Sequence, residues 1–155
     1  MDRIDTGILA ALQNKGRMSN KELAAAIGLS PSSCLERVRR LQDRGVIRGY
    51  HAEIDPVALG IGLQAFVSVR LSKHTREAVD AFREHLMSLP EVVSIYHVAG
   101  QDDFMAHVAV KDANHLKNLT LDAFTTREEV ARLNTALVYE RVSESAWPNY
   151  ATDER

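Results

Sequence analysis

Serine, lysine and arginine side chains gather between residues 21 and 48, and these side chains are common protein contacts to DNA. Hydroxyl groups exchange hydrogen bonds with base edges, and guanidinium groups bind guanine edges or phosphate oxygens. The candidate contact residues are Lys21, Ser30, Ser32, Ser33, Glu36, Arg37, Arg39, Arg40, Arg44 and Arg48. A solvated charged face on an ordinary helix would be the better interpretation if no other feature accompanied them.

A helix over the second half of this segment would divide its side chains between two faces. If Leu35, Val38 and Leu41 are buried, a turn of about 100° per residue directs other side chains to solvent. These are Ser32, Ser33, Glu36 and Arg40, with Arg37 and Arg39 beside them. Base contacts are expected from this outward face. Lys21 and Arg48 are expected at phosphates, which set affinity rather than sequence preference.

Two helices are predicted before this basic helix. The first follows apolar residues at helical spacing, which are Ile4, Ile8, Leu9 and Leu12. Gly16 follows them as a stop signal. The second helix starts at Ser19 and Glu22, which form a capping box, and it breaks at Gly28.

The basic helix itself has clear limits. Ser30 stands at its N-cap, Pro31 at its first position, where a missing N–H costs nothing, and Gly45 ends it. Two helices joined by a short turn are the pattern of a helix-turn-helix, whose second helix enters the major groove of DNA. The following segment, Val46–Asp55, is expected to form a two-stranded wing that turns near Gly49.

A different pattern starts at Leu63 and predicts a small α/β domain. The expected strands are Leu63–Leu71, Val92–Val98, Phe104–Val110 and Arg132–Val142, and the expected helices are Arg76–Leu89 and Ala113–Phe124. This β-α-β-β-α-β order is ferredoxin-like. The fold class is therefore α+β, with an all-α winged helix-turn-helix domain at 1–52, a linker at 53–62, the ferredoxin-like domain at 63–143 and a tail at 144–155 whose end is polar and loose.

Charge is distributed unevenly between these parts. Residues 1–50 carry nine Lys or Arg against five Asp or Glu, whereas residues 51–155 carry ten against sixteen. A basic N-terminal third on an acidic remainder is typical of a DNA-binding domain joined to a different one. No segment has the roughly 18 consecutive apolar residues of a membrane span, and the N-terminus has no signal-peptide character. A cytoplasmic protein is expected.

The chain resembles the leucine-responsive regulatory protein/AsnC (Lrp/AsnC) family, also called feast/famine regulators. The matching positions are Ile4, Asp5, Gly28–Ser32, Cys34, Arg37, Val38, Leu41, Gly45–Ile47, Gly49 and Tyr50. The element order of the second domain matches as well, so the resemblance extends to about Val142. It implies a bacterial or archaeal transcription regulator that controls genes of amino-acid metabolism or transport in response to an amino acid or related effector.

The resemblance also implies how the second domain works. In this family it is similar to ACT-type sensors, its sheets pair across homodimers, and dimers often assemble into octameric rings, here a tetramer of dimers. Effectors bind where dimers meet, beside a Gly-x-x-Asp loop. The corresponding residues are Gly100, Gln101, Asp102 and Asp103, and Arg132 and Thr135 fit the family pattern entering the last strand.

The identity of the effector stays open. Glycine and aspartate are also ordinary turn residues, so Gly100 and Asp103 would fit a plain hairpin. Asp103 would either accept hydrogen bonds from an ammonium group or hold the loop by accepting backbone N–H groups. Asp102 stands where the family often has an aromatic or apolar residue, and Glu128–Val130 replaces a Pro-Gly-Val turn.

Other functions have little support in the sequence. The six histidines show no metal-ligand spacing, so neither a metal nor a cofactor is predicted. The single cysteine, Cys34, is expected to be a buried packing residue. Without a phosphate-binding glycine loop or a nucleophile elbow, the chain is not expected to be an enzyme. The alternative is an architectural protein that organises DNA without a ligand, and stabilisation by amino acids would distinguish the two.

Overall fold

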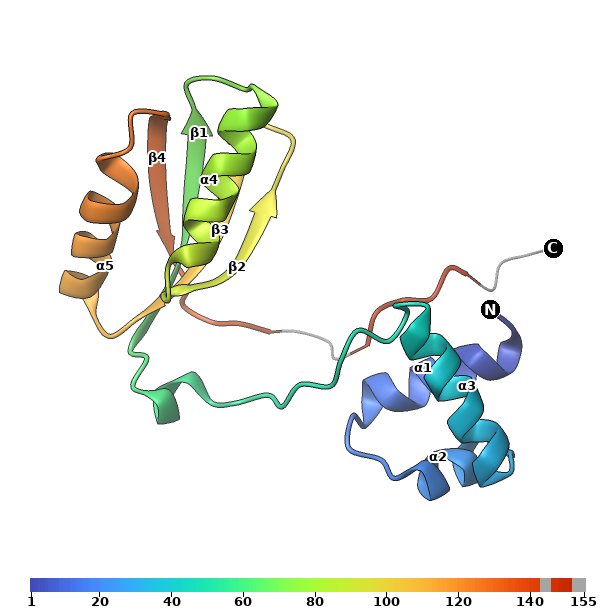
Figure 1. Ribbon diagram of the computed structural model, residues 1–155. Helices are drawn as coiled ribbons and strands as arrows, with labels where there is room; N and C mark the ends of the chain where they lie inside the picture. The colour runs from blue at the N-terminus through green and yellow to red at the C-terminus, as the bar shows by residue number, and fades with distance from the viewer. Residues whose placement is uncertain (143–145, 152–155) are drawn as a thin grey trace. The chain divides into compact units, whose positions relative to one another are not determined.

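The structure, a computed structural model, describes residues 1–142 and 146–151. The chain forms two compact units (Figure 1). The head unit contains Met1–Glu53 and the described residues from Val142 onward, and the sheet unit contains Ile54–Arg141. Each unit has its own hydrophobic core. The predicted loose end of the tail, residues 152–155, lies outside the described residues.

The three predicted helices of the head unit are present. They are α1 (Arg3–Asn14), α2 (Asn20–Ile27) and α3 (Pro31–Asp43). The capping box of Ser19 and Glu22 starts α2, and Gly28 ends it with a φ of 70°, a left-handed conformation that favours glycine. Ser30 starts α3, because its Oγ accepts the Ser33 N–H at 3.2 Å. The helix-turn-helix prediction is confirmed.

The core of the head unit differs in one respect from the predicted helix face. Its buried side chains are Ile8, Leu23, Ala24, Cys34 and Leu41. Cys34 is fully buried as expected, and burial raises the pKa of its thiol. Leu35, however, is 39% exposed, so its placement in the buried stripe is wrong. The inward face of α3 follows Cys34, Val38 and Leu41 instead, because the smaller cysteine fits in the contact with the other helices.

The structure contains no β-strand between Val46 and Asp55, so the prediction of a two-stranded wing there is wrong. The backbone N–H groups of Val46 and Ile47 both donate to the Leu41 carbonyl, at 2.9 and 3.2 Å. They close the C-terminus of α3 after Gly45, whose φ is 68°. Those groups are therefore occupied and cannot start a ladder with the residues that follow Gly49.

The sheet unit has the predicted β-α-β-β-α-β order, preceded by a 3₁₀ turn at Pro56–Leu59. Its elements are β1 (Leu63–Leu71), α4 (Arg76–Ser88), β2 (Val92–His97), β3 (Phe104–Val110), α5 (Ala113–Leu119) and β4 (Val130–Leu137). All neighbouring strands are antiparallel, in the order β2-β3-β1-β4. This is the ferredoxin-like arrangement.

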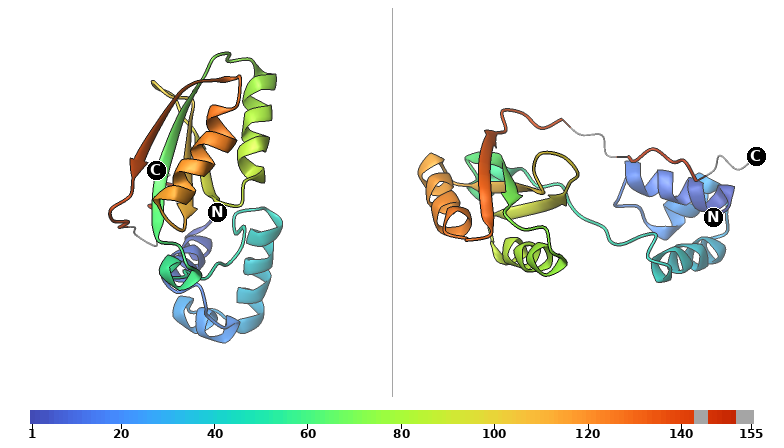
Figure 2. Two further views of the ribbon diagram at one scale, coloured as in Figure 1. Left: turned by 90° about the vertical axis from the view of Figure 1, so that its left-hand side faces the viewer. Right: turned by 90° about the horizontal axis from the view of Figure 1, so that it is seen from above.

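Helices α4 and α5 cover one face of this sheet (Figure 2). Alternation along β1 and β3 explains why, since every second side chain is apolar and buried against the helices. The buried strand residues are Ala65, Val67, Val69, Leu71, Phe104, Ala106, Val108 and Val110. The opposite face carries Phe66, Met105 and His107, which are only partly buried.

Two elements of the sheet unit differ from the prediction by more than one residue. The last strand runs from Val130 to Leu137 rather than from Arg132 to Val142. It lies at the edge of the sheet and pairs only with β1, whose hydrogen bonds to this strand end when the Val138 N–H donates to the Gln64 carbonyl at 2.9 Å. The predicted helix Ala113–Phe124 changes after Leu119 into a π-helical turn, Thr120–Thr125.

Candidate functional site

The N-terminal half of α3 presents hydroxyl groups to solvent. Ser30, Ser32 and Ser33 are all exposed. Their hydroxyls form a small network, with Ser30 Oγ 3.1 Å from Ser32 Oγ and 2.9 Å from Ser33 Oγ. Asn20 of α2 fixes the start of the helix by donating to the Pro31 carbonyl at 2.7 Å. The predicted contact residues at this end are therefore together, on a helix terminus of defined geometry.

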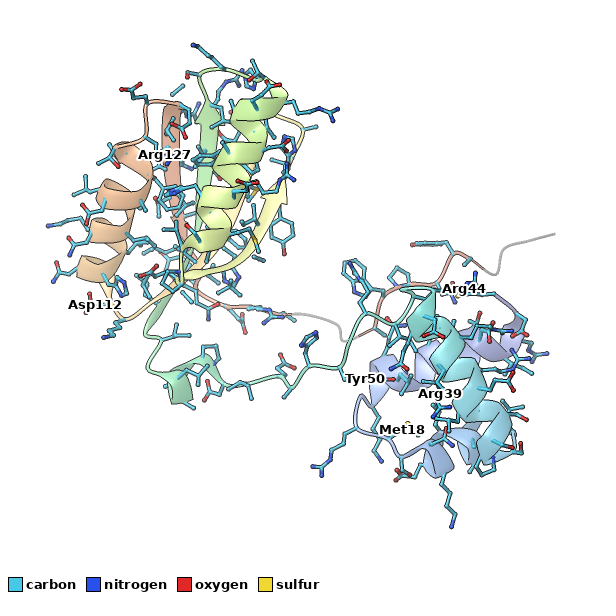
Figure 3. All side chains as sticks on the ribbon, in the orientation of Figure 1. Met18, Arg39, Arg44, Tyr50, Asp112 and Arg127 are labelled. Atoms are coloured by element: carbon cyan, nitrogen blue, oxygen red, sulfur yellow. The ribbon has the colours of Figure 1, made fainter. Side chains whose placement is uncertain are left out.

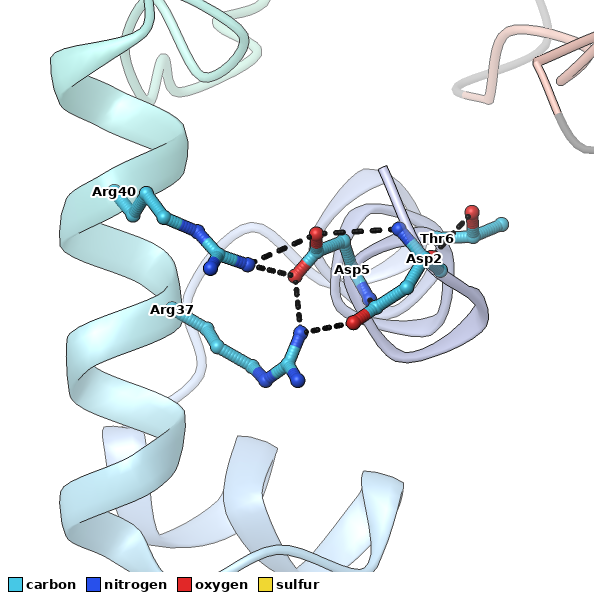
Figure 4. Close-up of polar contacts among 5 residues, drawn as sticks. All are labelled: Asp2, Asp5, Thr6, Arg37 and Arg40. Atoms are coloured by element: carbon cyan, nitrogen blue, oxygen red, sulfur yellow. Dashed lines mark hydrogen bonds and ion pairs between the residues drawn. The ribbon is translucent and has the colours of Figure 1, made fainter.

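Two of the predicted arginines are joined to carboxylates of α1 (Figure 4). Arg37 Nη1 donates to Asp2 Oδ2 and to Asp5 Oδ1, both at 2.7 Å. Arg40 Nη2 donates to the two oxygens of Asp5 at 3.3 and 3.2 Å. Asp2 and Asp5 also form the capping box of α1, so the same carboxylates start one helix and bind another.

The burial of Asp5 explains why it needs these partners. It is 1% exposed and is the only charged residue buried among the described residues. Burial by itself would raise the pKa of Asp5, but the hydrogen bond from Arg37, the Asp2 backbone and the charge of Arg40 outweigh burial, so the pKa is lowered. Hydrogen bonds to Asp2 and Asp5 raise the pKa of Arg37. The carboxylate is therefore ionised and compensated.

Four predicted cations remain available on the surface of the head unit. Lys21, Arg39, Arg44 and Arg48 are exposed and make no ion pair with any residue of the described ranges. Figure 3 labels Arg39 on α3 and Arg44 at its C-cap. Glu36, also predicted, is exposed on the same helix.

The contacts of Asp2 and Asp5 with the arginines of α3 were not predicted. A signal existed, because two aspartates three residues apart directly before an apolar helix resemble a capping box. Asp5 also lies three residues before the fully buried Ile8, at a spacing that puts both on one helix face.

In the sheet unit, the loop between β2 and β3 contains the predicted effector residues Gly100–Asp103. The Asp103 N–H donates to the Val69 carbonyl at 2.8 Å, and its Oδ2 accepts the Leu71 N–H at 2.7 Å. Its other carboxylate oxygen lies 3.0 Å from His74 Nδ1. Of the two roles open to Asp103, the geometry supports the one in which the carboxylate holds the loop against β1.

Asp102, the neighbour of Asp103, has a carboxylate oxygen without a hydrogen-bond partner. Its Oδ1 is buried and has no hydrogen-bond partner, the one such side-chain atom among the described residues. The Gln101 carbonyl accepts a hydrogen bond from Arg70 of β1. Gly100 has a φ of 157°, which L side chains rarely adopt, and no atom lies within 4 Å of the position of a Cβ. Asp102 therefore has one carboxylate oxygen that no described residue binds.

The structure does not bring Arg132 and Thr135 together. Arg132 pairs with Arg70 and Thr135 pairs with Val67, so the two residues face opposite sides of the sheet. Arg132 shares the face of Arg70, which contacts the loop through Gln101. Thr135 lies on the helix-covered side at the edge strand. Only Arg132 is therefore on the same side as a residue that binds the loop.

The departure at Glu128–Val130 lies at the same end of the sheet. The Glu129 carbonyl accepts the Ser72 N–H at 2.8 Å, next to the segment that carries His74. Burial would raise the pKa of Glu129, but a backbone hydrogen bond and Arg127 outweigh it and lower the pKa. This segment and the Gly100 loop therefore both contact the residues that follow β1.

Two histidines on β2 and β3 have ordinary packing roles. His97 stacks on Phe104, and His107 stacks on Phe66 and hydrogen-bonds Gln64 through Nε2 at 2.9 Å. Residues 1–142 and 146–151 contain no group of three side chains that could hold a metal ion. No helix in those ranges has the length and apolar character needed to cross a membrane.

Comparison with known proteins agrees with both units. The profile of a winged helix-turn-helix DNA-binding domain matches residues 1–48, and that of the Lrp/AsnC ligand binding domain matches residues 64–148. The transcriptional regulator AldR of Mycolicibacterium smegmatis is 42% identical over 92% of this chain and 83% of its own. The leucine-responsive regulatory protein of Escherichia coli is 36% identical over 94% and 88%.

Solved structures give the same result. A transcriptional regulator of Neisseria meningitidis in complex with L-Met has a TM-score of 0.85 and 31% identity, over 92% of each chain. An AsnC family regulator from Agrobacterium tumefaciens has a TM-score of 0.86 and 30% identity, over 96% of this chain and 97% of its own. These relatives are transcription regulators, and the chain is not an enzyme. It belongs to the Lrp/AsnC family of transcriptional regulators, with a DNA-binding helix-turn-helix and a ligand-binding domain.

Proposed function

We propose that this regulator controls genes of amino-acid metabolism or transport, and that an amino acid bound beside the Gly100 loop changes its binding to specific DNA sites. The observation that supports the DNA-binding part of this proposal is the exposed N-terminal end of α3, where the hydroxyls of Ser30, Ser32 and Ser33 face solvent on a helix-turn-helix. This is the part of the motif that contacts base edges.

The DNA-binding surface has two kinds of contact. Base edges meet Ser32, Ser33, Glu36, Arg39 and Arg40, whereas phosphates meet Lys21, Ser30, Arg44 and Arg48. Arg37 completes the surface through its contacts with α1. The unpaired cations on α2, on α3 and after α3 support this assignment, since phosphate contacts need charges that no carboxylate already neutralises.

Selection of bound fragments from sheared genomic DNA tests whether the protein binds specific DNA sequences. The experiment is done at fixed salt, with a competitor of random duplex. Recovery of fragments that share an imperfect palindrome is expected, because a dimer presents two α3 helices to two half-sites. Fragments with no shared sequence would contradict sequence-specific binding and favour the architectural alternative.

The effector site is proposed at the Gly100–Asp103 loop. Arg70 and Arg132 lie on one side of the sheet at this end, where a carboxylate group can bind. The unpartnered Oδ1 of Asp102 can accept a hydrogen bond from an ammonium group. The relative from Neisseria meningitidis was solved with L-Met, which supports an α-amino acid as the class of effector.

Thermal unfolding with each of the twenty amino acids tests this site. A ligand that binds only the folded protein raises the Tm, by about 3 °C at ten times its Kd for a chain of this size. The rise is expected for one or a few amino acids and should disappear in Arg132→Ala. A Tm that no amino acid changes at millimolar concentration would contradict the effector proposal.

Assembly follows from the face of the sheet that no helix covers. Phe66, Met105 and Tyr96 lie on this face and give it apolar surface. We propose that a second copy covers it in a homodimer and that four dimers form a larger ring. The domains are proposed at 1–52 and 63–143, joined by 53–62 and followed by the tail 144–155, and the regulator acts in the cytoplasm.

A further inference from the structure

The contacts between α1 and α3 indicate that Arg37 and Arg40 have different roles. We propose that Asp5 is a positioning residue for DNA recognition: it holds Arg40 in the orientation that contacts DNA, while Arg37 neutralises the carboxylates of Asp2 and Asp5 and contributes little to the contact. Asp5 itself does not touch DNA.

The exposed fractions of the three side chains support these different roles. The side chain of Arg37 is 25% exposed and that of Arg40 is 52% exposed, whereas that of Asp5 is 2% exposed. Arg37 is the more enclosed arginine, and it contacts two carboxylates rather than one. Arg40 is therefore the arginine that a DNA groove can reach without breaking the network.

The lengths of the hydrogen bonds also distinguish the two arginines. Arg40 uses Nη2 alone for its contacts with Asp5. These contacts are 3.3 and 3.2 Å long, and the N–H groups on Nε and Nη1 have no acceptor among the described residues. Arg37 directs Nη1 at both aspartates at 2.7 Å, which is the distance of a strong charge-assisted hydrogen bond.

Positioning matters because a free arginine has many side-chain conformations. Fixing such a side chain at an interface costs affinity, equivalent to a factor of about two to ten. Asp5 fixes Arg40 before DNA arrives, and it is itself fixed by its burial, its place in the first turn of α1 and Arg37. Loss of Asp5 therefore weakens DNA binding only where Arg40 is present.

This dependence is tested by a double-mutant cycle on the full-length protein. The affinity for one labelled duplex, recovered by fragment selection, is measured at fixed salt for wild type, Asp5→Asn, Arg40→Ala and the double variant. Arg40→Ala should lose about tenfold or more. Asp5→Asn should lose about fivefold in the wild type and nothing further in Arg40→Ala. An equal loss in both backgrounds would overturn the proposal, because Asp5 would then act only through the fold.

Asp2→Asn is the matched control, since Asp2 contacts Arg37 and not Arg40. It removes a carboxylate from the same helix turn, and the affinity for the duplex should stay within about twofold of wild type. A loss equal to that of Asp5→Asn would overturn the special role of Asp5.

A second comparison keeps the proposal testable if Asp5→Asn does not fold. Arg37→Gln and Arg40→Gln each remove one guanidinium, and their Tm and duplex affinity are compared. Arg37→Gln should lower the Tm more, and Arg40→Gln should weaken DNA binding at least fivefold more. The reverse order of the two affinities would overturn the assignment.

Discussion

At the scale of single residues, the head unit depends on one buried charge. Removing one partner of a buried ion pair leaves the other charge uncompensated, which costs more than the pair contributes in net stability. Asp5 is such a residue, because Arg37 and Arg40 both bind it. Its ionisation links the stability of the head unit to pH.

The pH dependence of unfolding should show this link. The folded-state pKa values of Asp5 and Asp2 lie below the usual 3.8, so their stabilisation is present above that value and is lost as the pH falls through the lower, folded-state value. We expect a Tm that is steady above about pH 5 and decreases more steeply below about pH 4 in wild type than in Asp5→Asn. Circular dichroism measures the Tm of the two proteins at each pH. The same pH dependence of Tm in both would contradict the prediction.

Asp103 has a comparable role in the sheet unit. Asp103→Ala leaves the N–H of the buried Leu71 without its acceptor and should lower the free energy of unfolding by about 1–2 kcal/mol. Urea denaturation measures the loss, and faster hydrogen exchange of the Leu71 amide locates it. Asp102→Asn is the control: Asp102 Oδ1 has no partner, so this change should cost nothing without effector. Equal losses for both variants would count against the loop assignment.

At the level of elements, α2 and α3 should contribute differently to DNA binding. We expect α2 to contribute to affinity and α3 to sequence preference. Lys21→Ala on α2 should reduce the slope of log K against log salt by about one and leave the preference unchanged. Arg40→Ala on α3 should weaken binding to the selected duplex more than to random DNA. Fluorescence anisotropy over a range of salt concentrations measures both. Equal weakening of the two duplexes by Arg40→Ala would make Arg40 a phosphate contact.

Helix starts were predictable because capping is local. Ser19, Glu22 and Ser30 act within three residues of the groups that they bind, so their roles are visible in the sequence. The strand alternation of β1 and β3 is equally local, since it reflects one covered face. The role of the loop between β2 and β3 in effector binding was predicted from the family resemblance instead.

Features that depend on distant partners were not predictable. The ion pairs of Arg37 and Arg40 join residues more than thirty positions apart, and helix periodicity alone placed both arginines on the solvent side. The expected wing failed because the Leu41 carbonyl takes the N–H groups that would have started it. The π-helical turn after Leu119 also escaped prediction, since His85 of α4 hydrogen-bonds the Ala123 carbonyl inside it.

At the scale of the whole molecule, the proposed dimer connects the two functions. A dimer presents two α3 helices, and half-site spacing then depends on how two chains pair. A ligand can shift only those assemblies that differ in their affinity for it. The uncovered face of the sheet is therefore the surface whose loss should affect DNA binding without touching α3.

Phe66→Glu tests this surface. The change places a charge at the centre of the uncovered face, beside His107, and should convert the dimer to monomer at micromolar concentration. Met87→Glu is the control, because Met87 is 70% exposed on α4, away from that face. Sedimentation velocity distinguishes the two species. A Phe66→Glu protein that sediments like wild type would place the dimer contact elsewhere.

In the proposed function, an amino acid at the Gly100 loop controls DNA binding by the head unit. The most direct test of this control is the affinity for a recovered duplex at fixed salt, with and without the amino acid that raises the Tm. We expect this affinity to change at least about fivefold, and the affinity for the amino acid to change by the same factor when duplex is present, since coupling is reciprocal. An affinity for DNA that the bound amino acid leaves unchanged would contradict the proposed function.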